Sequence, residues 1–142
     1  MRSSPHAQPA SVVSLFVNGT LMRGEPLQGN LAGAVFRSVT RTMPCYRLLS
    51  VRDMHPAMIL ATAGDGVSVT GELYDVSLGQ LKQVLAGEPP GLGLGVVDLA
   101  EGVQSLGICW TALELPPHAT DISSYGGWRE YLAARRAFPP HP

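Results

Sequence analysis

The feature that most constrains this chain is an apolar run at residues 12–17 that leads directly into an Asn-Gly pair. Apolar residues occupy both odd and even positions of VVSLFV, as is typical of a strand buried on both faces. We therefore predict a central strand of a sheet. Asn18-Gly19 would suit a hairpin turn, but residues 22–26 do not alternate as a returning strand would. The loop Asn18 to Leu21 therefore needs another explanation.

Length and composition predict a single domain. The 142 residues are 45% apolar and 15% charged, which is enough apolar material for a real core. We predict one domain over residues 11–137. The Ser-, Pro-, Ala- and His-rich ends, residues 1–10 and 138–142, are expected to be flexible tails.

The formal net charge of −1 indicates no clustered basic face, so we expect neither a nucleic acid nor a membrane as partner, and a small molecule as ligand. No apolar run approaches the roughly 20 residues of a membrane span, and the N-terminus lacks a signal-peptide core. These features predict a cytoplasmic protein.

Cysteines and histidines give no sign of a metal site. Cys45 and Cys109 are predicted to be small buried hydrophobes in a reducing compartment rather than a disulfide. No two of the four histidines have a spacing typical of zinc ligands. We expect no metal and no cofactor.

Further strands follow from period-two alternation and glycine-containing turns. Residues 34–41 alternate, and apolar runs at 46–51 and 57–62 extend the pattern. Because Ala63-Gly64-Asp65-Gly66 suits a tight reversal, residues 57–62 are predicted to form a hairpin with 67–76.

The second half predicts a helix, a hairpin and a last helix. Ser77 and Gln80 fit a capping box at the start of a helix that ends near Gly87, before two prolines. Residues 96–99 and 103–113 are predicted to pair, and a final helix covers about 128–136. Six or seven strands with two or more helices predict an α+β fold on a small, barrel-like mixed sheet.

The loop Asn18 to Leu21 is a candidate ligand site. At the end of a central strand, the amides of Asn18, Gly19, Thr20 and Leu21 can form one concavity that holds an anion such as a carboxylate. Asn18 tolerates left-handed backbone angles, and Gly19 allows close approach. A plain turn is the alternative.

Two glutamates are candidates for acid/base chemistry. Glu72 alternates with apolar neighbours in its strand and points either to solvent or into the hollow of the sheet. Glu88 sits between the first helix and two prolines, where partial burial would raise its pKa. An exposed loop glutamate is the alternative there. No Gly-x-Ser-x-Gly elbow is present, which disfavours covalent catalysis.

Arginines and aromatic residues supply further candidates. Arg41 and Arg47 flank a Pro-Cys-Tyr segment, and their guanidinium groups suit bidentate capture of a carboxylate or carbamate. A solvated charged face is the alternative, above all for Arg37. The aromatic residues of Tyr125-Gly126-Gly127-Trp128 are predicted to anchor the last helix.

Two segments, LFVNGTLMRG at 15–24 and VTGELYDV at 69–76, resemble the gamma-glutamylcyclotransferase-like superfamily. The resemblance implies a small barrel-like α+β domain. It also implies that the first loop binds the head of a gamma-glutamyl substrate, whose amine attacks its own side-chain carbonyl and releases 5-oxoproline. Glu88 is the residue that would inherit the acid/base role.

A closer resemblance covers nearly the whole chain. Residues 41–48 (RTMPCYRL), 91–102 (GLGLGVVDLAEG) and 121–132 (DISSYGGWREYL) are similar to the C-terminal domain of allophanate hydrolase. That resemblance implies a domain that assists breakdown of a carboxylated product, and assembly. The Ser-Ser-Lys segment of the amidase domain is not found here, so this chain alone is not expected to hydrolyse allophanate.

Three functions follow as alternatives. The first is a free-standing homologue of that C-terminal domain, which binds and processes a small carboxylated amide or carbamate through Asn18 to Leu21, Arg41 or Arg47, and Glu88. The second is a gamma-glutamylcyclotransferase. The third is a non-catalytic module that forms a homodimer or assembles with an amidase partner through residues 125–128.

Overall fold

A computed structural model describes residues 11–137. The predicted flexible tails, residues 1–10 and 138–142, lie outside the described residues.

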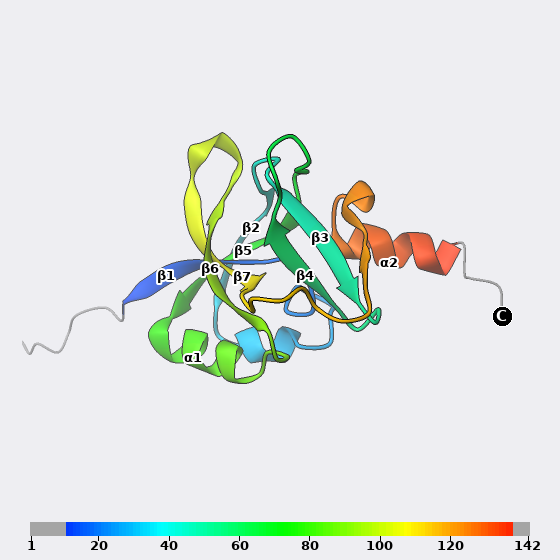
Figure 1. The fold of residues 1–142 in the computed structure, drawn as a ribbon. Coiled ribbons are helices and arrows are strands. Elements are labelled where there is room, and N and C mark those ends of the chain that lie inside the picture. Colours follow the sequence, from blue (N-terminus) through cyan, green and yellow to red (C-terminus); the bar gives the residue numbers. More distant parts are fainter. Residues whose placement is uncertain (1–10, 138–142) are drawn as a thin grey trace, which may run out of the picture.

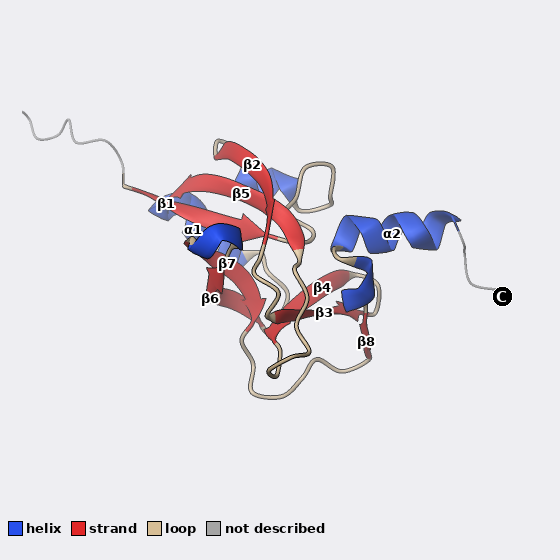
Figure 2. Cartoon of the chain, turned by 90° about the horizontal axis from the view of Figure 1, so that it is seen from above, coloured by secondary structure: helices blue, strands red, loops and turns tan. Residues whose placement is uncertain are grey.

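The larger sheet has five strands in the order β2-β5-β1-β7-β6 (Figures 1 and 2). β1 (Val12–Val17) is its middle strand, antiparallel to β5 (Thr70–Ser77) and parallel to β7 (Gln104–Trp110). The outer strands are β2 (Val35–Arg41) and β6 (Leu92–Asp98). The predicted central place of residues 12–17 is confirmed, and so is the second hairpin, which β6 and β7 form with Asp98 opposite Gln104.

The smaller sheet has three strands in the order β4-β3-β8. β3 (Tyr46–Val51) lies between β4 (His55–Leu60) and β8 (Ala119–Asp121), antiparallel to both. In Figure 2 this sheet lies beside the β6–β7 end of the larger one. The sequence pattern did not predict β8, because three residues are too few to show a period.

The predicted hairpin between residues 57–62 and 67–76 is wrong. β4 pairs with β3, and β5 belongs to the other sheet. The real reversal precedes β4, where Arg52 and Asp53 take positive φ angles of 54° and 56° without any glycine. Gly66 serves close packing instead, since a Cβ there would collide with the backbone of Pro44 and Cys45.

Two α-helices lie at opposite ends of the molecule (Figure 1). α1 (Leu78–Ala86) begins with the predicted capping box, in which Ser77 and Gln80 exchange side-chain to backbone hydrogen bonds, and its C-cap is Gly87. α2 (Trp128–Ala137) confirms the predicted last helix. Short 3₁₀ helices cover η2 (Gln28–Leu31), η3 (Ala100–Gly102) and η4 (Ser123–Tyr125).

The core joins both sheets and both helices. Leu15 and Phe16 of β1, Leu48 of β3, Val84 of α1 and Trp128 of α2 are each no more than 2% exposed. Burial of such side chains is the main contribution to the stability of the fold. Each fully buried side chain contributes about 1.5–3 kcal/mol. The predicted α+β class with a curled mixed sheet is confirmed, and in residues 11–137 the strands form two sheets rather than one closed barrel. Within the same range no helix has the length and apolar character to cross a membrane.

Candidate functional site

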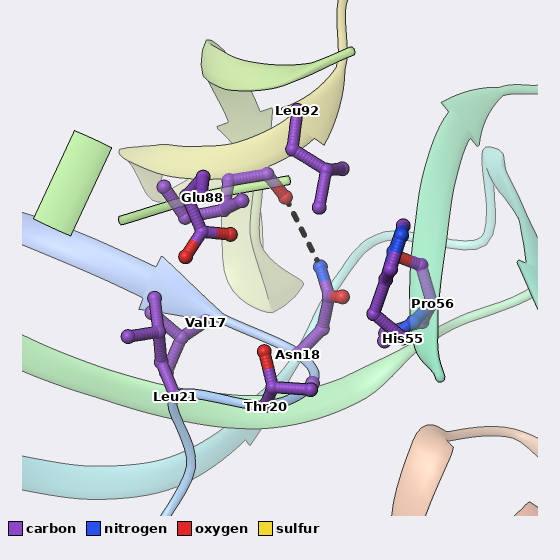
Figure 3. Close-up of a pocket in the computed structure, with 10 residues that line it drawn as sticks. Val17, Asn18, Thr20, Leu21, His55, Pro56, Glu88 and Leu92 are labelled. Carbon is purple, nitrogen blue, oxygen red and sulfur yellow. Dashed lines mark hydrogen bonds between the residues drawn. The ribbon is translucent and has the colours of Figure 1, made fainter. Parts of the chain in front are cut away.

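A small pocket forms where three segments meet: the loop after β1, the segment between α1 and β6, and the start of β4 (Figure 3). Its cavity is about 10 Å³, which is room for about one water molecule. Its lining residues are Val17, Asn18, Gly19, Thr20, Leu21, His55, Pro56, Glu88, Leu92 and Ile108.

The loop after β1 is held by its own side chain and backbone. Asn18 is 5% exposed, and its Nδ2 donates to the carbonyl oxygen of Ile108 on β7 at 3.3 Å. The carbonyls of Gly19 and Thr20 accept hydrogen bonds from later amides at 3.0 and 2.8 Å. In the described part of the chain, the amides of Gly19, Thr20 and Leu21 donate to no protein group. The loop therefore offers unpaired donors beside the pocket.

Gly19 is required by the packing of this loop, because a Cβ there would overlap the Pro56 ring at the start of β4. We expect Gly19→Ala to lower the free energy of unfolding by about 1–3 kcal/mol, the usual cost of overpacking. Urea unfolding measures it. Gly29→Ala is the matched control, because nothing lies within 4 Å of a Cβ at Gly29. Equal stability of the two variants would contradict this packing role.

Glu88 closes the pocket from the segment that follows α1. In Figure 3 its carboxyl group points toward the end of β1. Its Oε2 is buried and, in the described structure, has no hydrogen-bond partner. Burial raises the pKa of Glu88 to about 7, because desolvation disfavours the charged form.

A carboxyl group with these properties can take and give a proton near neutral pH. While protonated, it can also donate a hydrogen bond to an anionic or carbonyl oxygen. Neither Arg nor Lys is among the residues that line the pocket. The groups available to a ligand here thus include backbone amides, the Thr20 hydroxyl, the His55 ring and the Glu88 carboxyl.

The structure places the two predicted arginines away from this pocket. Arg41, at the end of β2, lines a different surface depression together with Glu101. Arg47 of β3 pairs with Asp121 of β8 at 3.0 Å and donates to the carbonyl oxygen of Asp65 at 2.8 Å. Asn18 to Leu21 and Glu88 come together, and Arg41 and Arg47 do not join them.

Glu72 faces inward and is fully buried, at the centre of an ion-pair cluster. It accepts hydrogen bonds from the Arg23 amide at 2.9 Å, the Arg23 Nε at 3.1 Å, the Arg129 Nη1 at 3.0 Å and the Tyr74 hydroxyl at 3.0 Å. Burial acts to raise its pKa, but these donors outweigh burial and hold the pKa below its usual range. Glu72 ties the loop after β1 and helix α2 to the sheet and does not line the Glu88 pocket.

Sequence reasoning missed both arginine partners of Glu72. Arg23 and Arg129 lie 49 and 57 residues from it along the chain, and no local pattern relates residues so far apart. Arg23 also lies over the Phe36 ring, 3.8 Å from its centroid. Sequence reasoning also missed His55, Pro56, Leu92 and Ile108 as pocket residues, because β4, β6 and β7 reach the site only through the tertiary fold.

The aromatic segment at 125–128 and the two cysteines also have clear places. Trp128 is 2% exposed and packs in the core, whereas Tyr125 is 45% exposed, so the aromatic segment anchors α2 chiefly through Trp128. Cys45 and Cys109 are free thiols. Within residues 11–137, no group of His, Cys, Asp and Glu side chains is arranged to hold a metal ion.

Comparison with known proteins places this chain in a family. The model of the allophanate hydrolase C-terminal domain matches residues 13–133. The chain belongs to the allophanate hydrolase C-terminal domain family. A comparison with curated protein sequences found no match.

Solved structures of other proteins share the fold. A uropathogenic E. coli-specific protein is 38% identical, with a TM-score of 0.81 over 87% of this chain and 97% of that one. Kluyveromyces lactis allophanate hydrolase is 24% identical, with a TM-score of 0.79 over 93% of this chain but only 22% of that one. An aig2-like protein from Mus musculus is 26% identical, with a TM-score of 0.60 over 75% and 82% of the two chains. This member of the allophanate hydrolase C-terminal domain family thus spans about a fifth of the K. lactis enzyme.

Proposed function

We propose that this domain binds a small molecule through a carboxyl, amide or carbamate head group, and that Glu88 exchanges a proton with it. The observation that carries the proposal is the buried, unpartnered Oε2 of Glu88 in the pocket. A buried polar atom without a partner is rare in native proteins and costs free energy. A ligand that supplies the missing hydrogen bond recovers that cost.

The neighbouring loop supports an oxygen-rich head group. The unpaired amides of Gly19, Thr20 and Leu21 favour an acceptor, and a protonated Glu88 donates to one as well. Because the pKa of Glu88 is raised to about 7, the group is largely neutral in mildly acidic solution and does not repel a carboxylate. This charge state explains how an anion can approach a pocket without arginine or lysine.

A second candidate function is gamma-glutamyl cyclotransfer, which the same pKa favours. The ionised Glu88 would accept a proton from the attacking amine of a gamma-glutamyl compound and pass it to the departing amine. A pKa near the working pH is optimal for such two-way proton transfer. The net products are 5-oxoproline and a free amine.

Replacing Glu88 by glutamine separates chemistry from binding. If Glu88 transfers the proton, we expect Glu88→Gln to lower 5-oxoproline release from gamma-glutamyl dipeptides by about 10²- to 10⁴-fold. The assay quantifies 5-oxoproline by chromatography, with Glu101→Gln as the control because Glu101 is exposed and lies outside the pocket.

Binding is tested separately with the gamma-glutamyl dipeptides, malonate and biuret. A compound that binds raises the midpoint of thermal unfolding. A rise with malonate but no 5-oxoproline from any dipeptide supports carboxylate binding over cyclotransfer. Unchanged turnover in Glu88→Gln removes Glu88 from the mechanism. If no compound raises the midpoint or is turned over, the proposed function is wrong.

A further inference from the structure

An apolar groove adjoins the Glu88 pocket. Its volume is about 590 Å³, within the usual range of small-molecule sites. The groove and the pocket share His55, and the groove wall begins at Pro89, the residue after Glu88. The two spaces are therefore adjacent parts of one surface.

The two spaces differ greatly in size, so they suit different parts of one ligand. The Glu88 pocket, at about 10 Å³, has room for one small polar group and not for a whole metabolite. Any ligand whose head group enters the pocket must place its remaining atoms outside it. Next to Glu88, on the side where Pro89 lies, the groove is the space that can receive those atoms.

The chemistry of the groove selects apolar atoms. Pro89, Pro90, Met54 and the Trp110 ring dominate its lining, with Arg52 as the charged lining residue. Met54 is 71% exposed, so its side chain is accessible to an apolar group of a ligand. Proline rings and an indole face suit flat or branched hydrocarbon groups.

The groove wall is held in place before any ligand arrives. Gly91 has a φ of 94°, and a Cβ there would collide with the Trp110 ring, so the glycine backbone lies directly against the indole. The Trp110 Nε1 donates to the Glu114 carbonyl oxygen at 2.7 Å, and the Thr111 amide donates to the Gly91 carbonyl oxygen at 2.8 Å. A preformed wall loses little entropy on binding.

We propose that this groove is a specificity subsite that holds an apolar, aliphatic or aromatic portion of the same small molecule whose polar head enters the Glu88 pocket. The inference rests on the proposed function, because it takes the Glu88 pocket as the site of the head group. It identifies the ligand class as amphipathic: a carboxyl, amide or carbamate head joined to a hydrocarbon group.

The first test compares gamma-glutamylglycine with gamma-glutamylphenylalanine by titration calorimetry. We expect the phenylalanine compound to bind about tenfold more tightly, since its ring leaves water for the groove. Met54→Gln should remove most of that preference, because it weakens binding of the phenylalanine compound more than binding of the glycine compound. Leu60→Gln is the matched control, because Leu60, at the far end of the strand that Met54 precedes, is 70% exposed and does not line the groove.

The second test examines the groove without the head-group site. Benzyl alcohol is titrated into ¹⁵N-labelled protein, and we expect it to shift the Trp110 indole N–H resonance in the wild type and in Glu88→Gln, and less in Met54→Gln. If benzyl alcohol shifts the Trp110 resonance but neither dipeptide binds, the proposed function is wrong, and so is the proposal that one ligand occupies both the pocket and the groove. The groove would then be an isolated apolar site. Equal affinity for the two dipeptides, or no response of Trp110 to benzyl alcohol, would overturn the subsite.

Discussion

Replacing Glu72 by alanine is expected to lower the free energy of unfolding by about 3 kcal/mol, in the range for removing one partner of a buried ion pair. The variant would leave the buried Tyr74 hydroxyl without its acceptor and two arginines without their shared carboxylate. The value lies at the low end because Arg23 and Arg129, with side chains 49% and 37% exposed, can turn toward water. Urea unfolding at pH 7 measures it.

Asp75→Ala is the matched control on the same strand. Asp75 pairs with Arg37 at 2.6 Å, but their side chains are 27% and 58% exposed. An exposed pair of this kind is worth about 0.2–1 kcal/mol. If Glu72→Ala costs no more than Asp75→Ala, the cluster around Glu72 does not stabilise the fold as we describe.

The pH dependence of the Glu72 cluster has a definite sign. Its pKa is lowered in the folded state, so its stabilising contribution is present above the ordinary glutamate value and is lost as pH falls through the folded value. We expect wild type and Glu72→Ala to converge in stability on the acid side.

Glu88→Gln is expected to stabilise the protein at pH 8 relative to wild type, by no more than about 3 kcal/mol. The pKa of Glu88 is raised from 4.5 to about 7, and each pKa unit corresponds to about 1.4 kcal/mol. Partial solvent access reduces that value. Because the folded state holds its proton more tightly, wild type loses stability as pH rises from about 4.5 to 7, whereas the neutral amide does not.

Urea unfolding at pH 5 and pH 8 measures this difference, with exposed Glu114→Gln as the control. We expect Glu88→Gln and wild type to be similar at pH 5 and to diverge at pH 8. A glutamine variant that is less stable than wild type at pH 8 would show that the ionised carboxylate has a partner in the fold. Such a result would remove the main argument for a ligand at this position.

Local signals in the sequence predicted the elements that carry the site. The apolar run of β1, the capping box at Ser77 and the glycine after α1 each act within a few residues, so their effect is visible in the sequence alone. Together they place Asn18 to Leu21 and Glu88 correctly at the ends of their elements. Their meeting across the pocket depends on the sheet order, which local patterns do not encode.

Long-range pairing accounts for what the sequence did not show. The reversal before β4 uses Arg52 and Asp53 at positive φ, and Asp53 is held there by hydrogen bonds with Ser50 and by Tyr131 of α2, 78 residues away. The alternation around Glu72 correctly marked a strand, but which face was buried depended on Arg23 and Arg129. A carboxylate becomes tolerable in a core only when such partners arrive with the tertiary fold.

The measurement that tests the central claim most directly is a carbon-13 NMR titration of the Glu88 carboxyl group, with and without malonate. We expect a midpoint of about 7 in the free protein and an upward shift when malonate binds, because a neighbouring anion disfavours ionisation. A midpoint near the ordinary glutamate value of 4.5, unchanged by malonate, would mean that Glu88 is an ordinary solvated side chain and that the pocket is not a ligand site.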